Sequence, residues 1–287
     1  MSEWFFVSDL HGHVDRYEKL FDAIGNEGPA AVLLGGDLFP SGFGAAASLE
    51  IPHDDFVMDF LAPRLEALRD RLGTAYPRVL LIFGNDDRRC EEPAVRGAAD
   101  AGLWEYIPGT RTSCNGHEVY GYPFVPPTPF LLKDWEKYDV SRYVDPGCVS
   151  PEEGLRSVAV PEHEVRHQTI QQDLDELVSE RPVDRAVFLF HSPPYRTNLD
   201  RAALDGRMID HVPVDVHVGS VAIKRFIEQR QPLVTLHGHI HESARLMGEW
   251  RERIGRTWCL SAAHDGPELA LVRFDPADPG AATRRLV

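Results

Sequence analysis

The chain has 287 residues, with 30 Lys and Arg against 45 Asp and Glu, so its formal net charge is −15 at neutral pH. With 43% apolar and 26% charged residues, its composition is that of a folded globular protein rather than a disordered one. The acidic balance excludes a protein that grips nucleic acid or an anionic membrane by charge alone, so we expect no strong non-specific nucleic-acid binding. We also expect no membrane partner, because no apolar run reaches the roughly 18 residues of a spanning helix.

The first residues and the cysteines favour a cytoplasmic location. The stretch Met1–Val7 lacks the basic region that opens a signal peptide. The cysteines lie far apart with no C-x-x-C spacing, which predicts buried reduced thiols rather than disulfides or a zinc clamp. They are Cys90, Cys114, Cys148 and Cys259.

Short apolar runs alternate with amphipathic stretches along the chain. The runs that predict buried strands are Trp4–Ser8, Ala31–Leu34, Arg78–Phe83, Ala186–Phe190 and Leu233–Leu236. The stretches that predict helices are Asp15–Ile24, Asp55–Leu72, Glu162–Glu180 and Ser220–Gln229. This alternation indicates an α/β fold. Two further strands, Thr257–Ser261 and Glu268–Phe274, are separated by only a turn and predict an added antiparallel element.

The middle of the chain, residues 103–160, has an irregular pattern rich in Pro, Gly and aromatic residues. Loops of this length inside a compact domain are usually functional or disordered. Aromatic residues such as Trp104, Trp135 and Tyr138 argue against disorder. We therefore predict a folded insertion near the active site, within a single domain of residues 1–287. No feature of the sequence indicates the oligomeric state.

Metal-binding residue types follow each of the first five predicted strands. These segments are Asp9-Leu10-His11-Gly12, Gly35-Gly36-Asp37, Gly84-Asn85-Asp86-Asp87, His191 and His237-Gly238-His239-Ile240-His241. Ligands of open α/β sheets bind beyond the carboxyl ends of the strands. Carboxylate and imidazole donors suit borderline divalent ions such as Mn, Fe, Zn or Ni. The donors are too many for one tetrahedral ion, but they divide naturally between two ions that share a bridging carboxylate.

The series D-x-H, G-G-D, G-N-x-D, H and G-H-x-H resembles the calcineurin-like metallophosphoesterase superfamily, over most of the chain from Asp9 to His241. The resemblance implies a four-layer α-β-β-α sandwich of two mixed sheets flanked by helices. It also implies two divalent metal ions, with Asp37 bridging them. The first ion would be held by Asp9, His11, Asp37 and His241, and the second by Asp37, Asn85, His191 and His239.

The reaction that the resemblance implies is hydrolysis of a phosphate ester by in-line attack of a hydroxide that bridges the two ions. The residues expected to take part in catalysis are Asp9, Asp37, Asn85, His239 and Asp86. Many family members carry a histidine at the position of Asp86, where it is thought to protonate the leaving group or hold the phosphate. An ionised carboxylate repels a phosphoryl oxygen, so Asp86 could help only if protonated or pointed away. It could equally be a turn residue that caps the following helix.

Without that histidine, esters with good leaving groups should be favoured, and we predict a phosphodiesterase. Two alternatives stay open: a phosphomonoesterase or nucleotide phosphatase on the same site, and a non-catalytic scaffold with this fold. The substrate is expected to be a small phosphorylated molecule, which the sequence does not identify further.

Three residues are candidates for substrate binding. His13 follows the D-x-H-G motif and could reach the substrate, or it could simply begin the next helix. Tyr195 and Arg196 lie just beyond His191, and Arg is well suited to phosphate. A rigid Pro-Pro loop carrying a solvated Arg is an equal interpretation of this segment.

Four other residues have candidate supporting roles or none. Asp87 and His237 could hold the ligands in place, although His237 could equally be a satisfied core histidine. His163 and His167 lie four residues apart in a predicted helix. Their charged surroundings favour a solvated face over a metal site.

Overall fold

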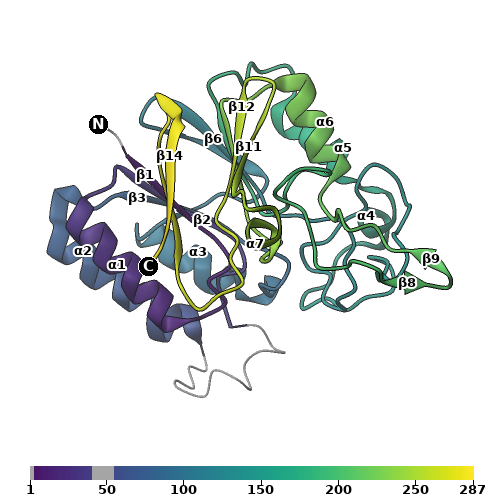
Figure 1. The fold of residues 1–287 in the computed structure, drawn as a ribbon. Helices are drawn as coiled ribbons and strands as arrows, with labels where there is room; N and C mark the ends of the chain where they lie inside the picture. Colours follow the sequence, from purple (N-terminus) through teal and green to yellow (C-terminus); the bar gives the residue numbers. More distant parts are fainter. Residues whose placement is uncertain (1–2, 41–54) are drawn as a thin grey trace.

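The computed structural model describes residues 3–40 and 55–287. Two mixed β-sheets pack face to face, with α1 and α2 outside one sheet and α5 and α6 outside the other (Figure 1). This confirms the predicted α/β class and the four-layer sandwich. None of the helices in the described part of the chain is long and apolar enough to cross a bilayer.

The first sheet has the strand order β14-β13-β1-β2-β3-β4 in the described residues. Its strands are β1 (Trp4–Val7), β2 (Ala31–Gly35), β3 (Arg78–Ile82), β4 (Glu105–Tyr106), β13 (Ala270–Asp275) and β14 (Asp278–Leu286). Strands β1 to β4 are parallel, whereas β13 and β14 add an antiparallel edge. The carboxyl ends of the four parallel strands therefore meet at one edge of this sheet.

The second sheet has the order β11-β12-β10-β7-β6-β5 in the same described part. Its strands are β5 (Thr110–Cys114), β6 (His117–Tyr122), β7 (Val187–Phe190), β10 (Val234–His237), β11 (Arg251–Ile254) and β12 (Thr257–Ser261). The central strands β6, β7, β10 and β12 are parallel, and the edge strands β5 and β11 are antiparallel to their neighbours.

Alternating side chains of the strands fill the spaces between the layers. In β1, Phe5 and Val7 face the helix layer while Trp4 and Phe6 face the other sheet. Successive side chains of a strand point to opposite faces, and parallel strands covered on both sides are apolar on both. The remaining elements are α1 (Val14–Glu27), η1 (Val57–Leu61), α2 (Ala62–Leu72), η2 (Gly73–Ala75), η3 (Arg89–Glu91), α3 (Glu92–Asp100), α4 (Glu162–His167), α5 (Ile170–Val178), β8 (Met208–Ile209), β9 (Val212–Pro213), α6 (Val221–Arg230) and α7 (Ser243–Met247).

The helix predicted over Glu162–Glu180 is wrong as a single element. It is two helices, α4 and α5, with extended backbone at Gln168 and Thr169 between them. Thr169 forms a capping box with Gln172, in which each side chain binds the backbone N–H of the other residue. His163 and His167 are exposed on α4, as the solvated-face interpretation expected.

The C-terminal pair of predicted strands does not form an antiparallel pair. Thr257–Ser261 is β12 of the second sheet, whereas the strand predicted over Glu268–Phe274 is β13 (Ala270–Asp275) of the first. The antiparallel pairing is instead that of β12 with β11 and of β13 with β1 and β14. The turn between them therefore carries the chain from one sheet to the other.

The stretch predicted to be irregular from Leu103 onward begins with three regular strands, β4, β5 and β6. The irregular part starts after Tyr122, and it is folded, since Trp135 and Tyr138 are buried. Asp134 accepts hydrogen bonds from the backbone N–H of Arg89 and from Ser157. This region is thus tied to the loop that follows β3, at the strand-end edge of the sheets.

Candidate metal centre

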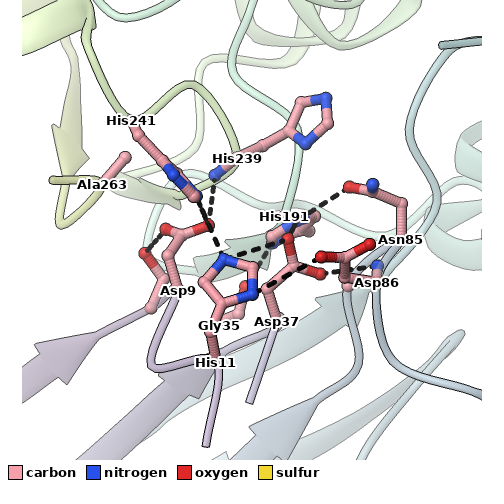
Figure 2. A network of polar contacts seen from close by, with 12 residues as sticks. Asp9, His11, Gly35, Asp37, Asn85, Asp86, His191, His239, His241 and Ala263 are labelled. Carbon is pink, nitrogen blue, oxygen red and sulfur yellow. Dashed lines mark hydrogen bonds and ion pairs between the residues drawn. The ribbon is translucent and has the colours of Figure 1, made fainter. Parts of the chain in front are cut away.

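The predicted donors of both sheets meet at the carboxyl ends of their strands. The loops after β1, β2 and β3 supply Asp9, His11, Asp37 and Asn85, and the loops after β7 and β10 supply His191, His239 and His241 (Figure 2). Ligand atoms of Asp9, His11, Asp37 and His241 all lie within 4.8 Å of one another. A second group with the same spacing is formed by Asp37, His191 and His239.

In the first group, the nitrogen and oxygen atoms that could bind an ion lie close to one another. His241 Nε2 lies 3.2 Å from Asp9 Oδ1 and 3.2 Å from His11 Nε2. His11 Nε2 lies 3.9 Å from Asp37 Oδ2. Four donor atoms thus converge on a space of the size that one ion would fill.

The second group is centred on His191, which is fully buried. His191 Nε2 lies 3.2 Å from Asp37 Oδ2 and 3.2 Å from Asn85 Oδ1. The ring of His239 lies above it, with the ring centroids 5.2 Å apart (Figure 2). Because Asp37 belongs to both groups, its carboxylate could hold an ion in each.

Backbone contacts fix the orientation of these donors. The Nδ1–H of His191 donates to Gly35 O at 2.8 Å, which leaves Nε2 free to bind an ion. Asp87 accepts hydrogen bonds from the backbone N–H groups of Leu38, Phe39 and Gly84. Asp87 therefore joins the loop that carries Asp37 to the loop that carries Asn85.

His237, for which a supporting role was predicted, connects strand β10 to the loop that follows His191. Its Nδ1 bonds Ser192 O at 2.9 Å and its Nε2 bonds Thr235 Oγ1 at 2.8 Å. Burial lowers the pKa of His237 to about 4, so the ring is neutral at pH 7. His237 is a satisfied core histidine that also holds the loop following His191.

Four of the predicted ligands have left-handed backbone conformations. The φ angles are 58° at Asp9, 46° at His11, 52° at Asp37 and 74° at His239. Non-glycine residues rarely adopt this region, and such strain persists where the surroundings impose it, often at functional sites. At Asp9 the buried Arg16 contributes, because its Nη1 donates to the Asp9 carbonyl at 2.7 Å.

Arg16 is a residue of this site that was not predicted from the sequence. Its guanidinium is buried and also contacts the carbonyl of Gly266. The feature of the sequence that could have indicated Arg16 is its position as a single arginine on the otherwise apolar face of α1, beside Tyr17 and Leu20.

Glycines surround the donors where a side chain would not fit. A Cβ on Gly84 would lie 2.6 Å from His191 Nε2, and one on Gly238 would lie 2.7 Å from Asp9 Oδ2. Real Cβ atoms essentially never come closer than 3.0 Å to such atoms. The glycines of the G-N-x-D and G-H-x-H motifs therefore keep the space around the donors open.

The charges of the donors oppose and shift one another. Burial alone would raise the pKa of the Asp37 carboxyl, but His191 and His11 lower it to about 2. Burial would lower the pKa of His191, but Asp37 and Asp9 raise it to about 9. Within residues 3–40 and 55–287, the only ion-pair partners of the Asp9 and Asp37 carboxylates are histidines. Two buried carboxylates held this way fit divalent cations, which would displace the His191 proton.

The other predicted residues lie outside the two groups. Asp86 points toward His11, with its Oδ2 at 3.5 Å from His11 Nδ1. Burial and Asp37 raise the pKa of the Asp86 carboxyl to about 6. His13 is exposed and directly precedes α1 without a side-chain cap bond, as in the helix-start interpretation.

Tyr195 and Arg196 contact each other rather than the donors. Tyr195 donates to Asp215 at 2.6 Å, and the Arg196 guanidinium lies 5.2 Å from the centre of the Tyr195 ring. In the described part of the chain, neither side chain forms a hydrogen bond or ion pair with a predicted metal ligand. Their role in substrate binding stays a prediction.

The geometry and the fold together define a family. The family model of the calcineurin-like phosphoesterases matches residues 5–243. The chain therefore belongs to the calcineurin-like phosphoesterase family. No curated protein sequence matches it significantly.

Solved structures show the same fold at low identity. One crystal structure is 15% identical with a TM-score of 0.59, covering 99% of this chain and 98% of the other. The protein TT1561 of Thermus thermophilus is 17% identical with a TM-score of 0.55 and the same coverage. A dimetal phosphatase from Danio rerio is 12% identical over 94% of this chain and 91% of its own, with a TM-score of 0.49.

Proposed function

We propose that the protein hydrolyses phosphate esters, preferably phosphodiesters, with two divalent metal ions drawn from Mn, Fe, Zn or Ni. The observation that carries the proposal is the pair of donor groups that share Asp37. Membership of the calcineurin-like phosphoesterase family supports the same reaction class.

Each group of residues has a distinct task in this proposal. Asp9, His11, Asp37 and His241 would hold one ion, and Asp37, Asn85, His191 and His239 the other. A bound pair of such ions makes a nucleophile from water at neutral pH and neutralises charge on the phosphoryl oxygens. The protein's own contribution is to fix the donors, through the Gly35 carbonyl at His191 and through Asp87 between the two loops.

The preference for diesters follows from position 86. No histidine stands there to protonate a poor leaving group, and the Asp86 carboxylate faces His11. Esters whose leaving group departs without a proton should therefore react faster. A small phosphorylated substrate fits the net charge of −15, which opposes binding to long nucleic acids.

A phosphomonoesterase on the same site and a non-catalytic scaffold are the alternatives. All seven predicted ligand positions hold competent donors, which counts against the scaffold. The proposal includes a cytoplasmic location, which the four free cysteines support.

The test combines metal analysis with hydrolysis. The protein is stripped of metal, loaded with Mn²⁺ and assayed on bis-p-nitrophenyl phosphate and p-nitrophenyl phosphate. We expect about two ions per chain and faster hydrolysis of the diester. Hydrolysis of neither ester by protein that carries two ions would favour the scaffold, and faster hydrolysis of the monoester would favour the monoesterase.

Asp37→Ala should abolish metal binding and hydrolysis together, because it removes the carboxylate that both groups share. Asp22→Ala is the matched control, since Asp22 is exposed on α1. It removes the same charge and should bind metal like the wild type. An Asp37→Ala protein that still loads two ions would contradict the bridging role.

A further inference from the structure

We infer that Asp86 is a positioning residue that holds the His11 ring with Nε2 directed at the metal. In place of the histidine that many relatives carry, this chain has a carboxylate that supports a ligand. The inference rests on the proposed function, because it assumes that the first donor group binds an ion.

The two nitrogens of His11 face different partners (Figure 2). Nδ1 lies 3.5 Å from Asp86 Oδ2, whereas Nε2 lies 3.2 Å from His241 Nε2 and 3.9 Å from Asp37 Oδ2. A neutral imidazole carries one proton, and the nitrogen without it can bind an ion. A proton on Nδ1, shared with Asp86, leaves the Nε2 lone pair for the metal.

Histidines that bind metals usually donate their other N–H to a carboxylate or a carbonyl, which fixes the ring and strengthens the ligand. His191 follows this rule with Gly35 O as acceptor. For His11, the facing carboxylate is that of Asp86, whose Oδ2 lies 3.5 Å from Nδ1, which is beyond the usual length of a hydrogen bond. A small rotation of the exposed end of the Asp86 side chain would close the gap, since this side chain is 34% exposed.

The backbone of Asp86 makes a second contact that does not depend on its side chain. Its N–H donates to Asp37 Oδ1 at 2.8 Å, and so holds the shared carboxylate. Any residue except proline retains this N–H, so a substitution of Asp86 removes only the contact with His11. The predicted loss is therefore confined to the ion bound by Asp9, His11, Asp37 and His241.

The same geometry argues against Asp86 as the acid that protonates the leaving group. Its Oδ2 faces His11 Nδ1, and a carboxylate that accepts the Nδ1–H is ionised and has no proton to give to a leaving group. The two roles predict different losses. A leaving-group acid affects poor leaving groups selectively, whereas a positioning residue affects metal binding and all esters alike.

The experiment compares Asp86→Ala, Asp86→Asn and the control Asp15→Asn, which removes one exposed charge on α1. Mn²⁺ binding to metal-free protein is measured by calorimetry. Asp86→Ala should lower the affinity for one of the two ions by about 10- to 100-fold and leave the affinity for the other close to that of the wild type. Asp86→Asn keeps an acceptor oxygen and should recover most of that loss, and Asp15→Asn should bind like the wild type.

A second readout does not need the metal. ¹⁵N NMR of the metal-free protein should show His11 with its proton on Nδ1 in the wild type, and this preference should be lost in Asp86→Ala. A wild-type protein that binds no Mn²⁺ but shows the Nδ1 tautomer would overturn the proposed function and keep the contact. Unchanged binding of both ions in Asp86→Ala, with a selective loss on poor leaving groups, would overturn the inference.

Discussion

Replacing Gly84 by alanine should remove the metal site while leaving the fold largely intact. The added Cβ would overlap Asp37 Oδ1, the nearest atom, and would lie 2.6 Å from both His191 Nε2 and the backbone N of Asp37, whereas ordinary contacts begin at 3.4 Å. To restore ordinary contact, His191 and Asp37 would each have to move away from the Cβ by about 0.8 Å, which is the difference between those distances. A catalytic or ligand group that is misplaced by about 1 Å lowers the reaction rate by about 100-fold. We expect the same displacement to lower the metal affinity by at least about 10-fold.

Gly97→Ala is the matched control for this substitution. Gly97 lies in α3, and a Cβ there would meet nothing within 4 Å. Alanine is a better helix former, so this variant should be more stable by about 0.5–1 kcal/mol and should bind metal normally. Calorimetric Mn²⁺ titration and hydrolysis of bis-p-nitrophenyl phosphate measure both proteins. Two ions bound by Gly84→Ala with wild-type affinity would refute the packing argument.

Two further predictions concern stability. The buried His237 ring has a pKa of about 4 and stays neutral between pH 7 and 5, whereas His237 of the unfolded chain becomes protonated in that range. The free energy of unfolding therefore decreases as the pH is lowered from 7 to 5, and His237 accounts for about 2 kcal/mol of the decrease. Urea unfolding of metal-free His237→Gln should show a fall smaller by that amount, and equal falls would contradict the assignment. Lys133→Met should cost about 3–5 kcal/mol, because it leaves the buried Glu136 carboxylate, now 2.5 Å from Lys133 Nζ, without its cation. Adding Glu136→Gln should restore over half of this loss in the same urea assay, and a single-variant cost below about 1 kcal/mol would show that the pair contributes little.

The candidate ligands could be predicted because the signal is local. A buried parallel strand is a short apolar run, and the residues directly after it need no long-range knowledge to be identified. Parallel strands bring their carboxyl ends to one edge, so Asp9, Asp37 and His191 meet although they are far apart in the chain. The resemblance to a family supplied the assignment of each donor to one of the two ions and of Asp37 to both.

The pairing of the edge strands could not be predicted in the same way. β5 and β14 contain many exposed or half-exposed residues, and their patterns resemble those of loops. Which sheet β12 and β13 join is decided by packing against distant strands, and nothing in the intervening turn encodes it. Asp86 likewise faces His11, which is 75 residues away in the chain, and no local pattern indicates that contact.

The distance along the chain between the donors has a consequence for the stage of folding at which the site can form. Asp9 and His241, which touch in the folded state, are 232 residues apart. During synthesis, neither donor group is complete until His239 and His241 have left the ribosome and both sheets have closed. An ion that needs all the donors of either group can therefore bind them together only after nearly the whole chain has been synthesised, so its binding would stabilise the closed arrangement of the two sheets.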